Sequence, residues 1–284
     1  MDWVRNSAEY PSVMTIKASV SCRLGRCAAL IVLVWLARAS AAEFRELNTD
    51  RDAFTPATTT VDVGTMLTEA SYVWIDNPGA PPTNSFPELL VRVGASERLE
   101  WRLGFNYEQG SGGAVVSAVE VGEAVLNAEA GSEASVLYGC KLLLTEGDGW
   151  IPRSVAIFEG FTPVAGEVWG TEPAATYAFG WELPEQWRFD AAARYTYADS
   201  EEGRFDRWSP SVVLRMPLAE RIEVHAEWFG TWSQGLINDS GQQYVGPGGH
   251  FMLLPGLEIG CRMGWGLTRD AAGYYFDTGI GWLL

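Results

Sequence analysis

The stretch "RLEWRLGFNYE", residues 98–108, alternates between apolar and polar residues. From Leu99 onward every second residue is apolar or aromatic, and the residues between them are charged, polar or glycine. A repeat of two residues is that of a β-strand whose two faces meet different surroundings. The stretch therefore predicts a strand with one apolar face, and the question is whether that face meets a dry core or a lipid bilayer.

The same alternation recurs along the chain after residue 64. Twelve periodic apolar stretches are present, although the one near residues 152–160 is poorly patterned. Each is close to the length of about 9–11 residues with which a tilted strand crosses a bilayer. Short connections ("GASER", "LPEQ", "MPLAE", "LPG") alternate with longer polar ones ("DNPGAPPTNS", "ADSEEGRFD", "SQGLINDSGQ"). Short turns at one end and long loops at the other are typical of an outer-membrane barrel.

The placement of charge decides between lipid and a dry core. In the well-patterned strands, charged side chains occur only on the face opposite the aromatic residues. A charge on a lipid-facing position near the bilayer centre costs about 2–4 kcal/mol, which accounts for its absence there. A soluble barrel with this pattern would point its aromatic face inward, and it would then need a large aromatic core without water. We therefore predict an all-β protein, a transmembrane antiparallel up-and-down β-barrel of about 12 strands with a polar lumen and an apolar exterior.

The N-terminal residues predict that the chain is exported, and the sequence divides into three predicted segments. In residues 1–42, Arg23 and Arg26 precede the apolar run 27–37, and "RASAA" follows it, as in a signal peptide whose true start is Met1 or Met14. Residues 43–63 are predicted to form a periplasmic N-terminal segment that acts as a small plug, and residues 64–284 the barrel.

The net charge of −16 argues against a nucleic-acid partner. The predicted location is the bacterial outer membrane.

Four stretches resemble one family of outer-membrane proteins. They are "LNTDRDAFT", "PELLVRVGASERLEWRLGFN", "LPEQWRFDAAARYTY" and "MPLAERIEVHAEWFG". They resemble the MetA-pathway of phenol degradation family over roughly residues 47 to 284. The resemblance implies a β-barrel transporter and, through the family's name, passage of small aromatic or apolar solutes. It implies no catalytic residues. The chain departs from the usual barrel ending in an aromatic residue, because its last residue is Leu284.

The inward phase of the strands supplies the candidate site residues. We predict that the lumen is lined by Glu88, Arg92, Glu100, Arg102, Arg188, Arg194, Arg215, Glu223, Glu227, Glu258 and Arg262. These side chains form either a selective pore lining or ion pairs that brace neighbouring strands, and pairing is favoured because opposite charges are close. Asp50, Arg51 and Asp52 are predicted to pair with lumen charges and form the plug.

The predicted function is an outer-membrane channel for passive uptake of small, aromatic or apolar solutes. One alternative is a structural barrel with a filled lumen. The other is a lipid-modifying enzyme, which is disfavoured because the two histidines, His225 and His250, are on the inward phase. No catalytic residue, metal site or cofactor is predicted. The expected partners are outer-membrane lipid, small solutes and the barrel-assembly machinery, with the oligomeric state left open.

Overall fold

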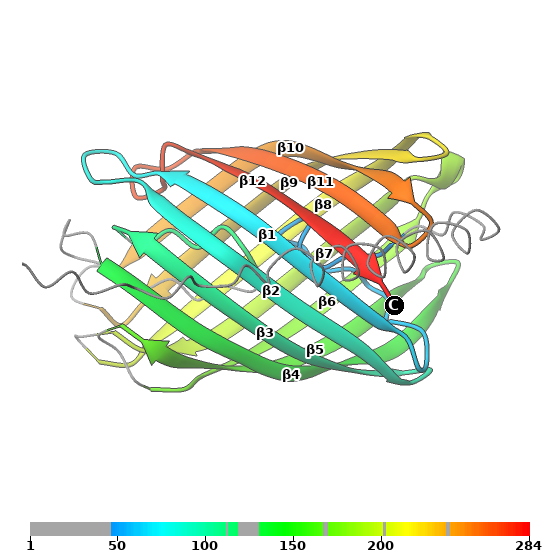
Figure 1. Ribbon diagram of the computed structural model, residues 1–284, viewed down its shortest axis with the longest axis horizontal. Helices are drawn as coiled ribbons and strands as arrows, with labels where there is room; N and C mark the ends of the chain where they lie inside the picture. The colour runs from blue at the N-terminus through cyan, green and yellow to red at the C-terminus, as the bar shows by residue number, and fades with distance from the viewer. Residues whose placement is uncertain (1–46, 112, 119–130, 167–169, 201–202, 237–238) are drawn as a thin grey trace, which may run out of the picture. The chain divides into compact units, whose positions relative to one another are not determined.

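Twelve antiparallel strands close into one barrel in the described part of the chain (Figure 1). The computed structural model describes residues 47–111, 113–118, 131–166, 170–200, 203–236 and 239–284. The strands are β1 (Met66–Asp76), β2 (Thr83–Ser96), β3 (Leu99–Gly110), β4 (Gly131–Asp148), β5 (Ile151–Ala165), β6 (Glu172–Glu182), β7 (Arg188–Ala198), β8 (Phe205–Ala219), β9 (Ile222–Gln234), β10 (Ser240–Leu254), β11 (Leu257–Gly266) and β12 (Tyr274–Leu283). The predicted fold class and strand number are confirmed. The predicted leader, residues 1–42, lies outside the described residues.

The barrel closes because its first and last strands pair with each other. β1 and β12 run antiparallel from Leu67 opposite Leu283 to Asp76 opposite Tyr274. Every other strand pairs with its neighbours in sequence, which is the up-and-down order. Closure leaves no strand with an unpaired edge, so the backbone can cross a bilayer with its hydrogen bonds satisfied.

Turn length separates the two ends of the barrel. At one end, β2–β3, β4–β5, β8–β9 and β10–β11 are each joined by two residues. The poorly patterned stretch forms β5, and the β4–β5 connection is only Gly149 and Trp150. Gly149 has a φ of 56°, the left-handed conformation that a tight turn requires and glycine adopts without strain. The short-turn end faces the periplasm in outer-membrane barrels.

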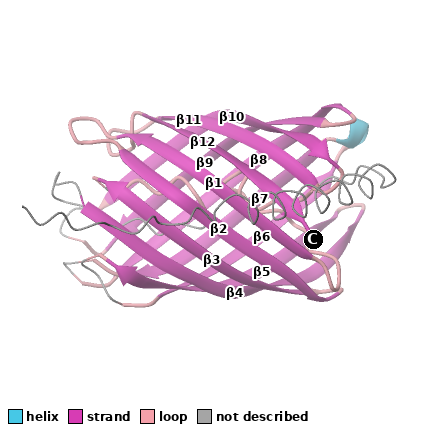
Figure 2. Ribbon diagram, viewed as in Figure 1, coloured by secondary structure: helices cyan, strands magenta, loops and turns pink. Residues whose placement is uncertain are grey.

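Helical structure is almost absent from the described residues (Figure 2). A short 3-10 helix, η1 (Pro184–Gln186), lies in the β6–β7 connection. No helix in the described ranges is long and apolar enough to cross a membrane.

The opening stretch of the sequence shows how the wall is divided. In β3, Trp101 and Leu103 are more than half exposed on the outside, whereas Arg102 between them is 4% exposed. The aromatic face therefore points outward and the charged face points into the barrel. This orientation matches the energetic cost of placing charge against lipid.

Candidate functional site in the barrel lumen

The lumen wall carries the predicted charged side chains. Ten of the eleven predicted residues are buried, and Arg188 is half-buried. They occupy the inner face of β2, β3, β7, β8, β9 and β11. These side chains are buried because residues 47–63 enter the barrel from the short-turn end (Figure 1). We call residues 47–63 the inner segment.

The inner segment brings one carboxylate into a group of wall cations. Asp50 accepts a hydrogen bond from Arg102, lies 2.7 Å from the Lys141 Nζ and 3.5 Å from Arg92. Glu100 adds a second carboxylate, 2.8 Å from the Nε of Arg92. We call these five residues the charged layer. Burial by itself raises the pKa of Asp50, but Arg92, Lys141 and Arg102 outweigh it and hold that pKa well below its usual range.

Wall carboxylates also bind the backbone of the inner segment. Glu69 accepts the N–H groups of Asp50 and Arg51 at 2.8 and 3.0 Å. Glu227 accepts those of Phe54 and Thr55 at 3.0 and 2.8 Å. Hydrogen bonds to a charged group contribute about 1.5–3 kcal/mol each, so the segment is held along its length. These contacts join the segment to β1 and β9.

The two other predicted plug residues reach different parts of the wall. Arg51 lies 3.6 Å from Asp277, and a Cβ added at Gly279 would lie 2.6 Å from the Arg51 Nη1. The missing side chain therefore makes room for the guanidinium. Asp52 lies 3.5 Å from Arg215 and 3.6 Å from the Nδ1 of His250. All three plug residues are buried.

An apolar region lies farther from the short-turn end of the barrel than the charged layer does. Phe54 stacks on Phe229, with ring centroids 4.3 Å apart, and Tyr244 and Tyr275 pack around Phe229 at 5.0 and 6.0 Å. We call these four rings, together with the residues packed on them, the aromatic chamber. The remaining members are Val73, Ile75, Ala114, Val115, Val116, Ala271 and Ala272. No member of the chamber carries a charge.

Residues 113–118, part of the long β3–β4 connection, cover the aromatic chamber from inside the barrel. Val115 and Val116 are buried against the rings. Wall side chains hold the backbone of this stretch: Gln242 donates to the Gly113 carbonyl, Arg262 to that of Val116 and Arg194 to that of Ala118, at 2.7 to 2.9 Å. Two of the predicted lumen residues, Arg194 and Arg262, therefore bind this connection.

A cavity of about 660 Å³ opens on the periplasmic side of the inner segment. Its lining includes Asn48, Thr58 and Asp52 of the segment and Arg188 and Arg215 of the wall. The β4–β5 and β6–β7 turns also border it. We call it the vestibule.

Sequence analysis did not single out the aromatic chamber, Lys141 or Glu69 as site residues. A signal for the chamber was present, because Phe229 and Tyr244 interrupt the polar phase of their strands. They lie directly opposite each other in the β9–β10 ladder. Two adjacent inward aromatic residues mark an apolar patch inside an otherwise polar lumen.

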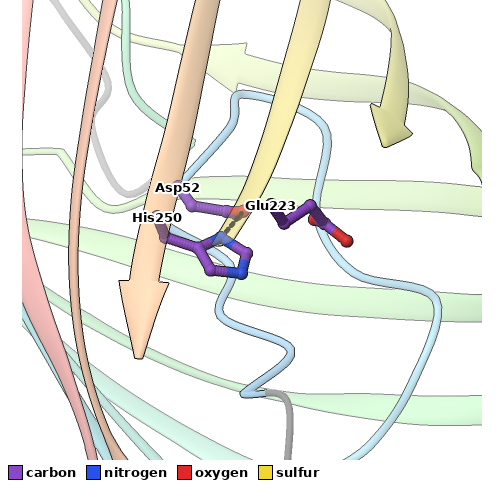
Figure 3. Close-up of side chains that lie close together, drawn as sticks. All are labelled: Asp52, Glu223 and His250. Carbon is purple, nitrogen blue, oxygen red and sulfur yellow. Dashed lines mark ion pairs between the residues drawn. The ribbon is translucent and has the colours of Figure 1, made fainter. Parts of the chain in front are cut away.

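A third group lies between the inner segment and β9–β10. Asp52, Glu223 and His250 each offer one donor atom, and these atoms lie within 4.8 Å of one another (Figure 3). Carboxylate oxygens and an imidazole nitrogen are ligands that divalent metals accept. The sequence alone did not predict this group, because Asp52 is 171 and 198 positions away from the other two.

Comparison with known families assigns the chain. Residues 46–284 match the family described as MetA-pathway of phenol degradation. The chain belongs to this family. The resemblance seen in the sequence is thus confirmed, and membership together with the closed barrel and its apolar exterior locates the chain in the bacterial outer membrane. No curated protein matches the chain significantly.

Solved outer-membrane structures align with most of this chain. An outer-membrane channel from Pseudomonas putida F1 has a TM-score of 0.58 and 11% identity, over 80% of this chain and 98% of that chain. The NanC porin has a TM-score of 0.49 and 9% identity, over 76% and 98%. The translocator domain of the autotransporter NalP from Neisseria meningitidis has a TM-score of 0.49 and 10% identity, over 78% and 89%. At such identity, the likeness to the P. putida channel shows a shared fold.

Proposed function

We propose that this family member is a passive outer-membrane channel for small aromatic or other apolar solutes. The observation that carries the proposal is the aromatic chamber, which is the largest uncharged cluster among the described residues of a barrel whose inner face also carries many charged and polar side chains. An aromatic solute gains about 25 cal/mol for each Å² of apolar surface that it buries. Sugars and ions gain nothing comparable there, so the chamber favours apolar solutes.

A charged side chain next to the chamber also suits a substituted ring. The Arg262 guanidinium lies 5.4 Å from the Tyr275 ring centroid and donates to the Val116 carbonyl at 2.7 Å. A solute that displaced Val116 would find both an aromatic surface and a free donor for its hydroxyl or carbonyl oxygen. The family's name, which refers to phenol degradation, agrees with this solute class.

The inner segment is proposed as the plug on the periplasmic side of the chamber. Asp50, Arg51 and Asp52 attach it to the wall, and Phe54 forms one side of the chamber. A solute leaving the chamber would pass this segment and enter the vestibule. The other charged side chains of the lumen then form ion pairs that stabilise neighbouring strands, and they give the exit a polar lining. We also propose that the barrel-assembly machinery inserts the chain and that lipid surrounds it.

Solute flux into liposomes tests the proposal. Liposomes containing the purified barrel should take up a small phenol faster than a sugar of similar size. Phe229→Ala should change phenol flux by several-fold and leave sugar flux almost unchanged. Phe158→Ala, the same substitution at a side chain that is 51% exposed on the outside, is the matched control and should change neither flux.

A structural barrel with a filled lumen is the second candidate, and the filled lumen favours it. Most of the inner segment and residues 114–117 lie buried inside the wall. The two candidates differ in a deletion of residues 47–60, which lie before the first strand. For a plugged channel, conductance in a planar bilayer rises in the folded deletion variant. No flux in the wild type together with unchanged conductance in the deletion variant would favour the structural barrel.

A further inference from the structure

Three side chains from separate elements meet beneath the inner segment. Glu223 on β9 and His250 on β10 are directly opposite each other in the strand ladder, and both are buried on the inner face. Asp52 approaches them from the inner segment, with its Oδ2 3.6 Å from the Nδ1 of His250 (Figure 3). The group therefore links the segment to two adjacent strands of the wall.

Buried polar atoms without hydrogen bonds provide a second observation. Among the described residues, the Oδ1 of Asp52 and the Nδ1 of His250 make no hydrogen bond, although both residues are more than nine-tenths buried. Neither ring nitrogen of His225 has one either, and this residue lies on the same inner face of β9, two positions after Glu223. The nearest charged contacts of the Asp52 and His250 atoms, 3.5 Å from the Asp52 Oδ1 to Arg215 and 3.6 Å from the His250 Nδ1 to Asp52, are longer than an ordinary hydrogen bond. A buried polar group without a hydrogen bond costs about 1–3 kcal/mol. Such groups in one place indicate a missing water or ion.

We infer that Asp52, Glu223 and His250 form a binding site for a divalent transition-metal ion such as Zn²⁺. An imidazole together with two carboxylates suits zinc or nickel better than the oxygen-seeking calcium and magnesium ions. Zinc binds nitrogen and oxygen at about 2.0–2.2 Å, so its ligand atoms lie roughly 3.3 Å apart. The Asp52–His250 separation of 3.6 Å is already near this value, and rotation of the Glu223 side chain would complete the set.

Two arginines next to the site already contact its carboxylates, so a metal ion must compete with them for these ligands. Arg215 lies 3.5 Å from Asp52, but its shortest contact, 2.6 Å, is with Asp190. Arg188 donates to both oxygens of Glu223, at 2.8 and 3.0 Å. A carboxylate has several lone pairs, so Glu223 can bind a metal through one oxygen and keep Arg188 on the other. Arg215 can remain on Asp190 when Asp52 turns to the metal.

Metal binding would fasten the inner segment to the wall. Two of the three ligands belong to β9 and β10, and the third belongs to the segment. An ion that binds all three stabilises the docked segment relative to the undocked one, because the undocked segment lacks the complete site. The channel would then be held closed by metal.

Calorimetric titration of the folded full-length barrel with Zn²⁺ tests the site. We expect one equivalent to bind to the wild type and at least tenfold weaker binding to Asp52→Asn and His250→Ala. Glu88→Gln removes a buried lumen carboxylate outside the group and should bind zinc like the wild type. Asp52→Asn lies outside every strand, so the barrel should fold whatever happens to the site. Resistance to SDS at room temperature checks folding of each variant.

Cobalt provides a measurement that reports ligation directly. Co²⁺ bound to the wild type should give visible absorption bands that His250→Ala lacks and Glu88→Gln retains. Absence of stoichiometric binding to the folded wild type would overturn the inference, as would equal affinity in Asp52→Asn. Neither readout depends on solute flux, so failure of the metal site and failure of the proposed channel function are distinguishable.

Discussion

The charged layer and the aromatic chamber fill the same lumen by different means. In the charged layer, Asp50 is held by three cations through directed contacts. In the chamber, Phe54 is held by stacking on Phe229 and by apolar contacts that have little directional preference. The two residues are only four positions apart in the inner segment. One short segment is thus fixed at one point by charge and at another by apolar packing.

This difference predicts how each region responds to change. Buried ion pairs depend on every partner, because a cation left without its anion stays desolvated and uncompensated. Apolar packing tolerates exchange of one hydrocarbon side chain for another of similar volume. We expect the charged layer to fix the position of the segment and the chamber to adapt to a solute.

Loss of the central carboxylate should have the largest effect. Asp50→Ala removes the common partner of Arg92, Arg102 and Lys141 and should destabilise docking of the segment by about 3–5 kcal/mol. Protease cleavage within residues 47–63 of the folded barrel measures this docking. Thr60→Ala, in the same segment, is the control and should leave protection unchanged. Equal protection in Asp50→Ala would mean that the charged layer does not fix the segment.

A smaller effect is expected from crowding the wall beneath the segment. A Cβ added at Gly281 would lie 2.7 Å from the Thr49 Cγ2 and 3.1 Å from the Glu258 side chain. Overpacking of this kind costs about 1–3 kcal/mol, so Gly281→Ala should weaken docking in the same protease assay. Gly131→Ala has nothing within 4 Å of the new Cβ and is the matched control. If both variants behaved alike, the segment would not be closely fitted to β12.

Conservative exchange in the chamber should cost less. Phe54→Leu keeps an apolar side chain and loses mainly the ring stacking, so docking should weaken by about 1 kcal/mol. The segment should stay largely protected from protease, while solute flux through the chamber changes. Protection as poor as that of Asp50→Ala would show that both regions depend on directed contacts.

The smallest effect is expected outside the lumen. Arg204 and Asp199 form an ion pair, 3.2 Å apart, whose side chains are 31% and 20% exposed. Such pairs contribute about 0–1 kcal/mol and weaken in salt, so Arg204→Ala should change urea unfolding only slightly. The contribution should disappear in 1 M salt, whereas docking of the segment should persist. Loss of docking at high salt would indicate that water reaches the charged layer.

Residues 98–108 show why the barrel could be predicted from the sequence. The side-chain period of a strand is two, and lipid excludes charge from one face, so Arg102 and Leu103 are assigned to opposite faces by local information alone. The β5 stretch was harder, because its buried positions include the neighbours Ser154 and Val155, which breaks the alternation. Its neighbours in the barrel nevertheless pair with it along its length.

The inner segment shows what local information leaves open. Its charges, Asp50 to Asp52, predicted contact with lumen charges but not which ones. Asp50 meets Lys141 and Asp52 meets His250, partners 91 and 198 positions away, and no local pattern specifies such pairs. Residues 113–118 are similar, because their backbone carbonyls bind Arg194 and Arg262 and backbone groups carry no sequence signature.

By itself the sequence determined the class of fold, the approximate number of strands, the faces of the patterned strands and the family. These properties follow from short-range alternation and from the cost of charge in lipid, which act on each strand separately. Only the tertiary structure decided that Phe54, Phe229, Tyr244 and Tyr275 form one chamber and that Asp52, Glu223 and His250 form one group. Closure of the barrel brings distant residues to the same level of the lumen, and that level depends on the register of all the strands together.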